Sequence, residues 1–131
     1  IYGNPTNRFV SEFMGEVNVV DVEAGESGGL VDMATGATYQ SPTGESGFRD
    51  AALVVRPEDI RFLANPDDPA ENKLSGVVYN DYLLGSRVQY QVRVGKSQIF
   101  LVEKLREQQM DVQRGATVTI AWDTSESMLF T

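Results

Sequence analysis

The side chains that most often carry out catalysis are missing from this sequence. It contains neither histidine nor cysteine, so it lacks the commonest general base, the commonest metal ligand and any thiolate nucleophile. Carboxylates lie near one another at Asp67-Asp68 and at Glu23 and Glu26. Both sets fall in polar, turn-rich stretches without the spacing of a calcium loop. We therefore interpret them as solvated acids and predict neither a catalytic nor a metal site.

One short run imitates the end of a phosphate-binding loop. Gly95-Lys96-Ser97 has the right three residues, but the motif needs a glycine five positions before Gly95, where this chain has Tyr90. It also needs a helix after the serine, and the chain continues with the β-favouring run 99–102. A hairpin turn is the better interpretation, and no nucleotide-hydrolysing site is predicted in this chain.

The run Arg56-Pro57-Glu58 places two opposite charges around a proline at the end of an apolar stretch, 51–55. Proline cannot continue a central strand and holds the preceding residue extended. One interpretation is a strand end with a weak surface ion pair. The other is a joint between two β lobes, with Arg56 and Glu58 tying the lobes together. The local pattern favours the first interpretation and leaves the second open.

Composition limits the partners of the 131-residue chain. It has 19 acidic and 11 basic residues and a net charge of -8, which repels nucleic-acid phosphates, so no nucleic-acid partner is expected. Val118, Ile120 and Trp122 recur at every second position. Trp122 is therefore predicted to lie in the core rather than to stack on bases. No apolar run approaches the ~20 residues of a membrane-spanning helix. The chain opens on Ile1 without a signal peptide, and we expect it to be a piece of a longer protein.

The elements that must position these residues begin with a short helix over residues 1–15. Pro5 suits its first turn, Phe9 and Phe13 share an apolar stripe, and Gly15 can end it. Such a short helix must dock on another element to be stable.

The remainder, 16–131, is predicted to be mainly β. Short apolar runs are separated by Gly, Pro, Ser and Asn, and Val88 to Val94 alternates strictly with polar residues. The prolines and acids of 64–72 mark a linker, which divides the chain into lobes of about 16–63 and 73–131. Tyr82 to Gly85 is expected to form an apolar corner. Many short strands of this kind are typical of a small barrel or sandwich.

Several stretches together resemble the C-terminal regulatory domain, often called TOBE, of the ATP-binding subunits of ABC importers. The opening run 1–18 resembles the segment that leaves their nucleotide-binding domain, with Ser11 where alanine is usual. Val55-Arg56-Pro57-Glu58-Asp59 matches a V-R-P-E element, and 74–77, 82–85 and 115–122 follow in the same order and spacing.

The resemblance implies two OB-like β lobes and contacts between two copies of the domain. It implies a regulatory, non-enzymatic fragment, with ATP and magnesium bound by a missing ATPase domain of the same polypeptide. That polypeptide would work with transmembrane permease subunits at the cytoplasmic face of the cell membrane, in an importer of spermidine/putrescine or iron type. It favours the joint interpretation for Arg56, Pro57 and Glu58. It implies structural or coupling roles for Phe9, Phe13, Gly15, Asn18, Tyr82, Gly85 and Trp122.

A different class of function stays open. The chain could be a free-standing β domain that binds a small ligand, and its acidic surface would then favour a cation. Residues 25–47 match nothing specific, so no ligand pocket is predicted there.

Overall fold

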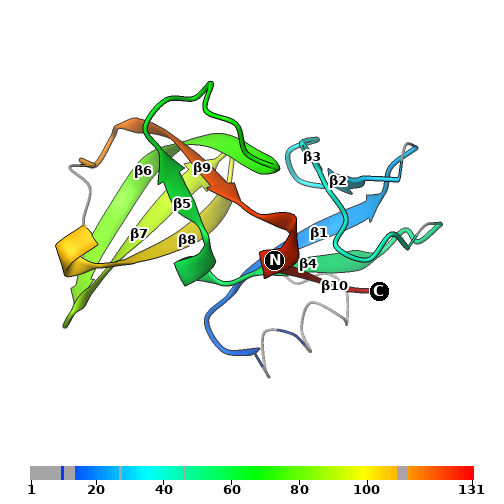
Figure 1. Ribbon diagram of the computed structural model, residues 1–131, viewed down its shortest axis with the longest axis horizontal. Coiled ribbons are helices and arrows are strands. Elements are labelled where there is room, and N and C mark those ends of the chain that lie inside the picture. Colours follow the sequence, from blue (N-terminus) through cyan, green and yellow to red (C-terminus); the bar gives the residue numbers. More distant parts are fainter. Residues whose placement is uncertain (1–9, 11–13, 27, 46, 109–111) are drawn as a thin grey trace.

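The computed structural model describes residues 10, 14–26, 28–45, 47–108 and 112–131 (Figure 1). The predicted N-terminal helix, with Phe9 and Phe13, lies largely outside these residues and stays a prediction. In the described part, strands form two five-stranded antiparallel sheets, so the mainly β prediction is confirmed. No described helix has the length and hydropathy needed to cross a bilayer.

The first sheet has the order β10-β4-β1-β2-β3. Its strands are β1 (Asn18–Ala24), β2 (Leu30–Asp32), β3 (Thr38–Tyr39), β4 (Ala51–Val55) and β10 (Ser127–Phe130). All five residues of β4 are buried, as expected for an apolar run with a partner strand on each side. β1 alternates buried and half-buried residues, which is typical of a strand with one face toward the core.

The second sheet has the order β5-β9-β6-β7-β8. Its strands are β5 (Arg61–Leu63), β6 (Asn72–Leu84), β7 (Arg87–Val94), β8 (Gln98–Leu105) and β9 (Thr117–Trp122). The predicted apolar face of β7 is confirmed, because Val88, Tyr90, Val92 and Val94 are all buried, whereas Gln89 on the predicted polar face is buried as well. The sheet curls around this core. Phe62 of β5 meets Tyr90 of β7 edge to face at 5.1 Å, although two strands separate them in the sheet.

The two sheets share one hydrophobic core. Trp122 at the end of β9 is fully buried, and its ring lies 5.1 Å from Tyr39 of the first sheet and 6.0 Å from Phe100 of the second. The core position predicted for this tryptophan is confirmed. A side chain on Gly95 would meet Thr35 at 3.3 Å, so the β7–β8 turn also packs on the β2–β3 turn.

The sheets do not follow the predicted lobe limits of 16–63 and 73–131. β5 lies before the expected linker yet pairs with β9, and β10 lies at the end of the chain yet pairs with β4. The chain therefore changes sheet at 56–60 and again at 123–126, and 64–71 is a loop within the second sheet. Nothing in a three- or four-residue apolar strand identifies its pairing partner, and this limits prediction from the sequence.

The apolar corner expected at Tyr82 to Gly85 is instead the end of a long strand. β6 continues to Leu84 in register with β7, after a bulge between Val78 and Asn80. Tyr82 and Leu84 are well exposed, so this stretch is part of the sheet but does not fill the core.

Candidate functional site

The site that the sequence pointed to lies where the chain passes between the sheets. We call this region the joint and define it as the two crossing segments 56–60 and 123–126, together with Asn18 and Leu101. Each crossing contains one turn of 3-10 helix, η1 (Pro57–Asp59) and η3 (Thr124–Glu126). Figure 1 shows both turns between the two sheets, near the middle of the molecule.

The first crossing is set by its proline, as predicted. Arg56 is extended, with φ -72° and ψ 142°, and Pro57 opens the turn at its first position. Ile60 closes the turn by donating its N–H to the Pro57 carbonyl at 3.4 Å and buries its side chain completely. Pro57 is also buried, so buried side chains lie at the beginning and at the end of this turn.

Arg56 and Glu58 lie at the joint, on either side of Pro57. Both side chains are exposed, and among the described residues neither forms an ion pair. The tie between the lobes that the sequence suggested for Arg56 and Glu58 therefore stays a prediction. Any regulatory role for these two side chains stays a prediction and would act through their exposed charges.

Asn18 connects the sheets directly. Its backbone belongs to β1, next to Val55, while its side-chain amide donates to the Leu101 carbonyl of β8 at 2.9 Å. The same side chain accepts from the Leu101 N–H at 2.6 Å. One amide thus imitates a strand segment against the edge of β8, and it is only 4% exposed. Buried polar groups paired in this way fix a unique arrangement, because breaking the pair leaves them unsatisfied.

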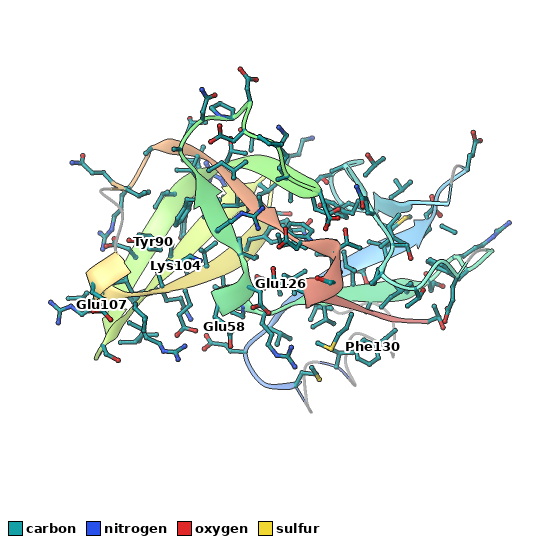
Figure 2. All side chains as sticks on the ribbon, in the orientation of Figure 1. Glu58, Tyr90, Lys104, Glu107, Glu126 and Phe130 are labelled. Atoms are coloured by element: carbon teal, nitrogen blue, oxygen red, sulfur yellow. The ribbon has the colours of Figure 1, made fainter. Side chains whose placement is uncertain are left out.

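The two crossings also meet through their charged side chains. Arg61, the first residue of β5 after the first crossing, forms an ion pair at 3.2 Å with Asp123 of the second crossing. The carboxyl groups of Asp59 and Glu126 lie close enough to interact electrostatically. Burial and the Asp59 charge raise the pKa of Glu126, while burial and the Arg61 charge lower the pKa of Lys104 beside them. Figure 2 labels Lys104 and Glu126 in this region.

The side chain of Asn72 forms a polar network with the second crossing. Its amide donates to the Trp122 carbonyl at 3.4 Å and to the Thr124 hydroxyl at 3.1 Å, and it accepts from the Gln40 N–H at 2.7 Å. The Glu71 carboxylate accepts a further hydrogen bond from the Thr124 N–H at 2.7 Å. Asn72 starts β6 and Gln40 follows β3, so this network also connects the two sheets.

The remaining predicted residues are not brought together with the joint. Tyr82 lies on the exposed part of β6, where its hydroxyl accepts from Asn80 at 2.7 Å. Gly85 turns the chain into β7 with φ +66°, a conformation that favours glycine. Gly15 has φ +75° just before β1, consistent with the left-handed position expected of it.

One buried polar pair was missed by the sequence reasoning. Asp32 accepts from the Tyr39 hydroxyl at 2.7 Å and from the Ala34 N–H at 2.9 Å. Burial and this hydrogen bond raise the pKa of Tyr39. The only signal in the sequence was that Asp32 follows two apolar residues in β2. Nothing in the spacing predicts Tyr39 as its partner.

The polar contacts of the joint connect the first sheet to the second. Among the described residues, no three carboxylates gather where they could hold a metal ion. The Asn18 amide is bound to both backbone groups of Leu101, and this pair joins the two sheets.

Comparison with known proteins identifies relatives of this chain. The chain is 28% identical over 120 residues to the "Fe(3+) ions import ATP-binding protein FbpC" of Brucella suis biovar 1, which covers 90% of this chain and 33% of that protein. It is 29% identical over 137 residues to the "Spermidine/putrescine import ATP-binding protein PotA" of Rubrobacter xylanophilus, covering 98% of this chain and 35% of the relative. The chain thus spans about a third of the length of these relatives.

A solved structure shows the same fold. The cytoplasmic molybdate-binding protein ModG, in a molybdate-bound form, superposes with a TM-score of 0.71 at 12% identity, covering 89% of this chain and 96% of ModG. The sequence profile of the TOBE domain matches residues 53–130, a range that contains both crossings. The chain therefore belongs to the TOBE domain family and is related to the ATP-binding subunits of importers.

Proposed function

We propose that this chain is the regulatory and dimer-stabilising domain of the ATP-binding subunit of an ABC importer of spermidine/putrescine or iron type. The named relatives of both types support this proposal. ATP and magnesium would be bound by an ATPase domain of the parent protein, and this domain would perform no catalysis. The parent would act with permease subunits at the inner face of the cell membrane.

The observation that carries the dimer proposal is an exposed apolar surface on the second sheet. Tyr82, Leu84 and Leu105 are 44%, 47% and 36% exposed. Arg87 lies opposite both leucines in the strand register, which brings the leucines to one face of the sheet. We call these three residues the hairpin patch. Exposed apolar clusters on a small domain mark contact surfaces.

The charges around the hairpin patch suit contact with a second copy. Arg87 pairs with Glu103 at 3.6 Å, and Asp81 pairs with Arg114 at 2.8 Å. The patch region is thereby neutralised locally, although the whole chain carries -8. A symmetric dimer places the same patch on both sides of the contact, and local neutrality removes the repulsion that two acidic surfaces would meet.

The dimer proposal predicts concentration-dependent association that fails when the patch is charged. Leu84→Glu should weaken the dimer by at least about tenfold, because the glutamate would be desolvated at an apolar contact. Sedimentation velocity across a concentration series measures this. Met33→Glu, at a 55% exposed methionine next to the first sheet, is the matched control and should leave association unchanged. A chain that stays monomeric at all concentrations would contradict the proposal.

Parentage has its own test. The coding sequence directly upstream of Ile1 should encode a phosphate-binding loop followed by a helix. A gene whose product begins at this isoleucine would overturn the proposal for the parent protein, whatever the outcome of the dimer experiment.

A free-standing ligand-binding domain is the second candidate. The match to ModG, a molybdate-binding protein of the same fold, favours it, while the charge of -8 favours a cation over an oxyanion. Calorimetric titration with spermidine, Fe³⁺ and molybdate separates the candidates. Saturable heat with one of them supports the second candidate, and no heat with any of them supports the first.

A further inference from the structure

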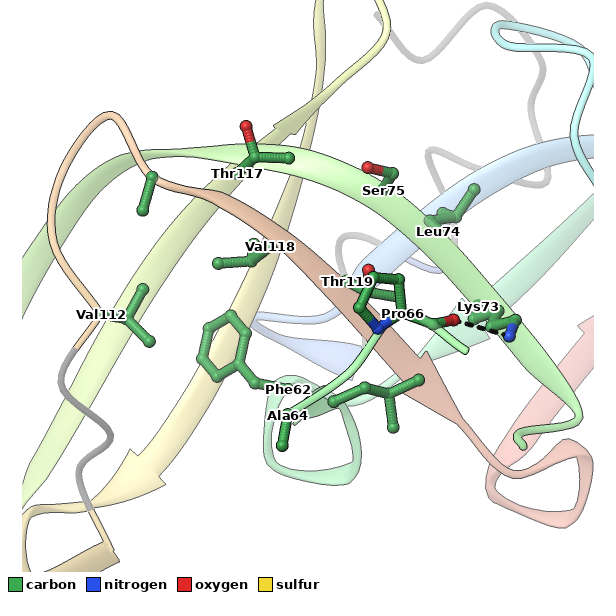
Figure 3. A pocket seen from close by; sticks show the side chains of 12 residues that line it. Phe62, Ala64, Pro66, Lys73, Leu74, Ser75, Val112, Thr117, Val118 and Thr119 are labelled. Carbon is green, nitrogen blue, oxygen red and sulfur yellow. Dashed lines mark hydrogen bonds between the residues drawn. The ribbon is translucent and has the colours of Figure 1, made fainter. Parts of the chain in front are cut away.

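A pocket opens on the second sheet, away from the joint. Its volume is about 500 Å³, within the range typical of small-molecule sites. Figure 3 shows it running from Val112 and Phe62 at one end to Lys73 at the other. No residue of the joint or of the hairpin patch lines it.

The pocket exists because β5 is shorter than its partner. β5 pairs with β9 only as far as Leu63 and Thr119, and β9 begins at Thr117. After Leu63 the chain turns away at Asn65, whose carbonyl accepts from the Asp68 N–H at 3.0 Å. Beside the start of β9 no strand therefore continues β5, and the edge of the barrel core is left open there.

One end of the pocket is apolar and the other is cationic. Phe62, Val112 and Val118 form the apolar end, and the last two are partly buried against the core. At the other end the Lys73 ammonium donates to the Pro66 carbonyl at 2.9 Å and to the Asp68 carbonyl at 3.2 Å. An ammonium has three donors, so one stays available.

The polar end keeps unused hydrogen-bonding capacity. In the described part of the chain, Lys73 has no carboxylate within ion-pair distance. The hydroxyls of Ser75 and Thr119 lie opposite each other in the β6–β9 register and form no side-chain hydrogen bond with described residues. Because the Asn65–Asp68 turn already holds the lysine, little side-chain freedom would be lost on binding.

We propose that this pocket binds a small amphipathic carboxylate, with its apolar tail against Phe62, Val112 and Val118 and its head group at Lys73. The carboxylate accepts hydrogen bonds from the free ammonium donor and from the hydroxyls of Ser75 and Thr119. A lysine satisfied only by carbonyl oxygens favours an anion over a neutral head group. This inference goes beyond the proposed function and does not depend on it.

Octanoate, below its micelle-forming concentration, is the probe for the 131-residue chain. Octylammonium and 1-octanol carry the same tail with a cationic or neutral head. We expect octanoate to shift the methyl resonances of Val112 and Val118 saturably in heteronuclear NMR spectra, and octylammonium to leave them unchanged. 1-Octanol should bind more weakly. Equal binding of octylammonium, or shifts that map outside the pocket, would overturn the inference.

Two variants and a control separate the ends of the site. Lys73→Gln should weaken octanoate about tenfold, as loss of a charge-assisted hydrogen bond does. Lys96→Gln, at an exposed lysine in the β7–β8 turn, should change nothing. Ala116→Leu fills the pocket and should abolish binding. If Ala116→Leu fails to fold, the two lysine variants decide, since both lysines are exposed. Equal affinity in Lys73→Gln and Lys96→Gln would refute the head-group contact.

Discussion

At the scale of single residues, Asn18 shows how one side chain can replace a strand. Its amide matches both backbone groups of Leu101 while its backbone serves the other sheet. Aspartate keeps the acceptor but loses the donor, and it brings a buried negative charge against a carbonyl oxygen. Asn18→Asp should therefore lower the free energy of unfolding by about 3 kcal/mol, measured by urea denaturation.

Asn80 provides the matched control for Asn18. Its amide donates to the Tyr82 hydroxyl at the surface and accepts from the Asp81 N–H at 3.0 Å, an acceptor that aspartate retains. Asn80→Asp should change stability by no more than about 0.5 kcal/mol. If both variants lost the same stability, the amide pair with Leu101 would not be what holds the sheets together.

Glu126 makes the joint sensitive to pH. Burial and the nearby Asp59 charge raise the pKa of Glu126 in the folded state above its ordinary value. In the window between the unfolded and the folded pKa, the folded state binds more protons, so stability falls as pH rises. Glu126→Gln removes this loss and should raise stability at pH 7, with no gain below pH about 4.

Thermal unfolding at a series of pH values checks the Glu126 prediction. Glu45→Gln, which changes an exposed glutamate outside the joint, is the control and should show no difference between neutral and acid pH. A Glu126→Gln variant that gained as much at pH 3 as at pH 7 would show that its effect is not protonation.

At the scale of elements, β6 depends on a glycine where it changes partners. The strand pairs with β9 over 72–77 and with β7 over 77–84. A Cβ on Gly76 would lie 2.7 Å from the Arg93 carbonyl oxygen and 2.7 Å from a methyl of Val92. Gly76→Ala should therefore cost at least about 2 kcal/mol, measured by urea denaturation.

Ser75 is the control on the same strand. It is exposed and forms no side-chain hydrogen bond with described residues, so Ser75→Ala should change stability by less than about 0.5 kcal/mol. Equal losses in Gly76→Ala and Ser75→Ala would mean that β7 moves aside at little cost.

The elements also show what could be predicted from the sequence. Alternation predicted β7 and β9, and the apolar run 51–55 predicted β4, because burial of a strand face leaves a local pattern. Pairing partners leave no such pattern, so the exchange of β5 and β10 between the predicted lobes could not be seen. For the joint, the proline and its conformation were predictable, but the amide pair of Asn18 joins residues 83 positions apart.

At the scale of the whole molecule, this exchange should make folding a single event. Each sheet takes one strand from the other side of the expected linker, and Trp122 packs between the sheets. Tryptophan fluorescence reports this shared core, and far-ultraviolet circular dichroism reports both sheets. The two signals should therefore give the same urea midpoint. Different midpoints would mean that the sheets unfold separately.

Cutting the chain at the expected linker tests the same idea more severely. A fragment of residues 1–63 would keep β1 to β4 but lose β10, which leaves β4 without one of its two neighbours. A fragment of residues 64–131 would lose β5 and with it Phe62, which packs on Tyr90. Neither fragment buries enough apolar surface to offset its conformational entropy, so neither should unfold cooperatively in urea. Mixing the fragments should restore strand circular dichroism, because each carries the strand that the other lacks. A cooperative transition in either fragment alone would show that the predicted lobes are independent units after all.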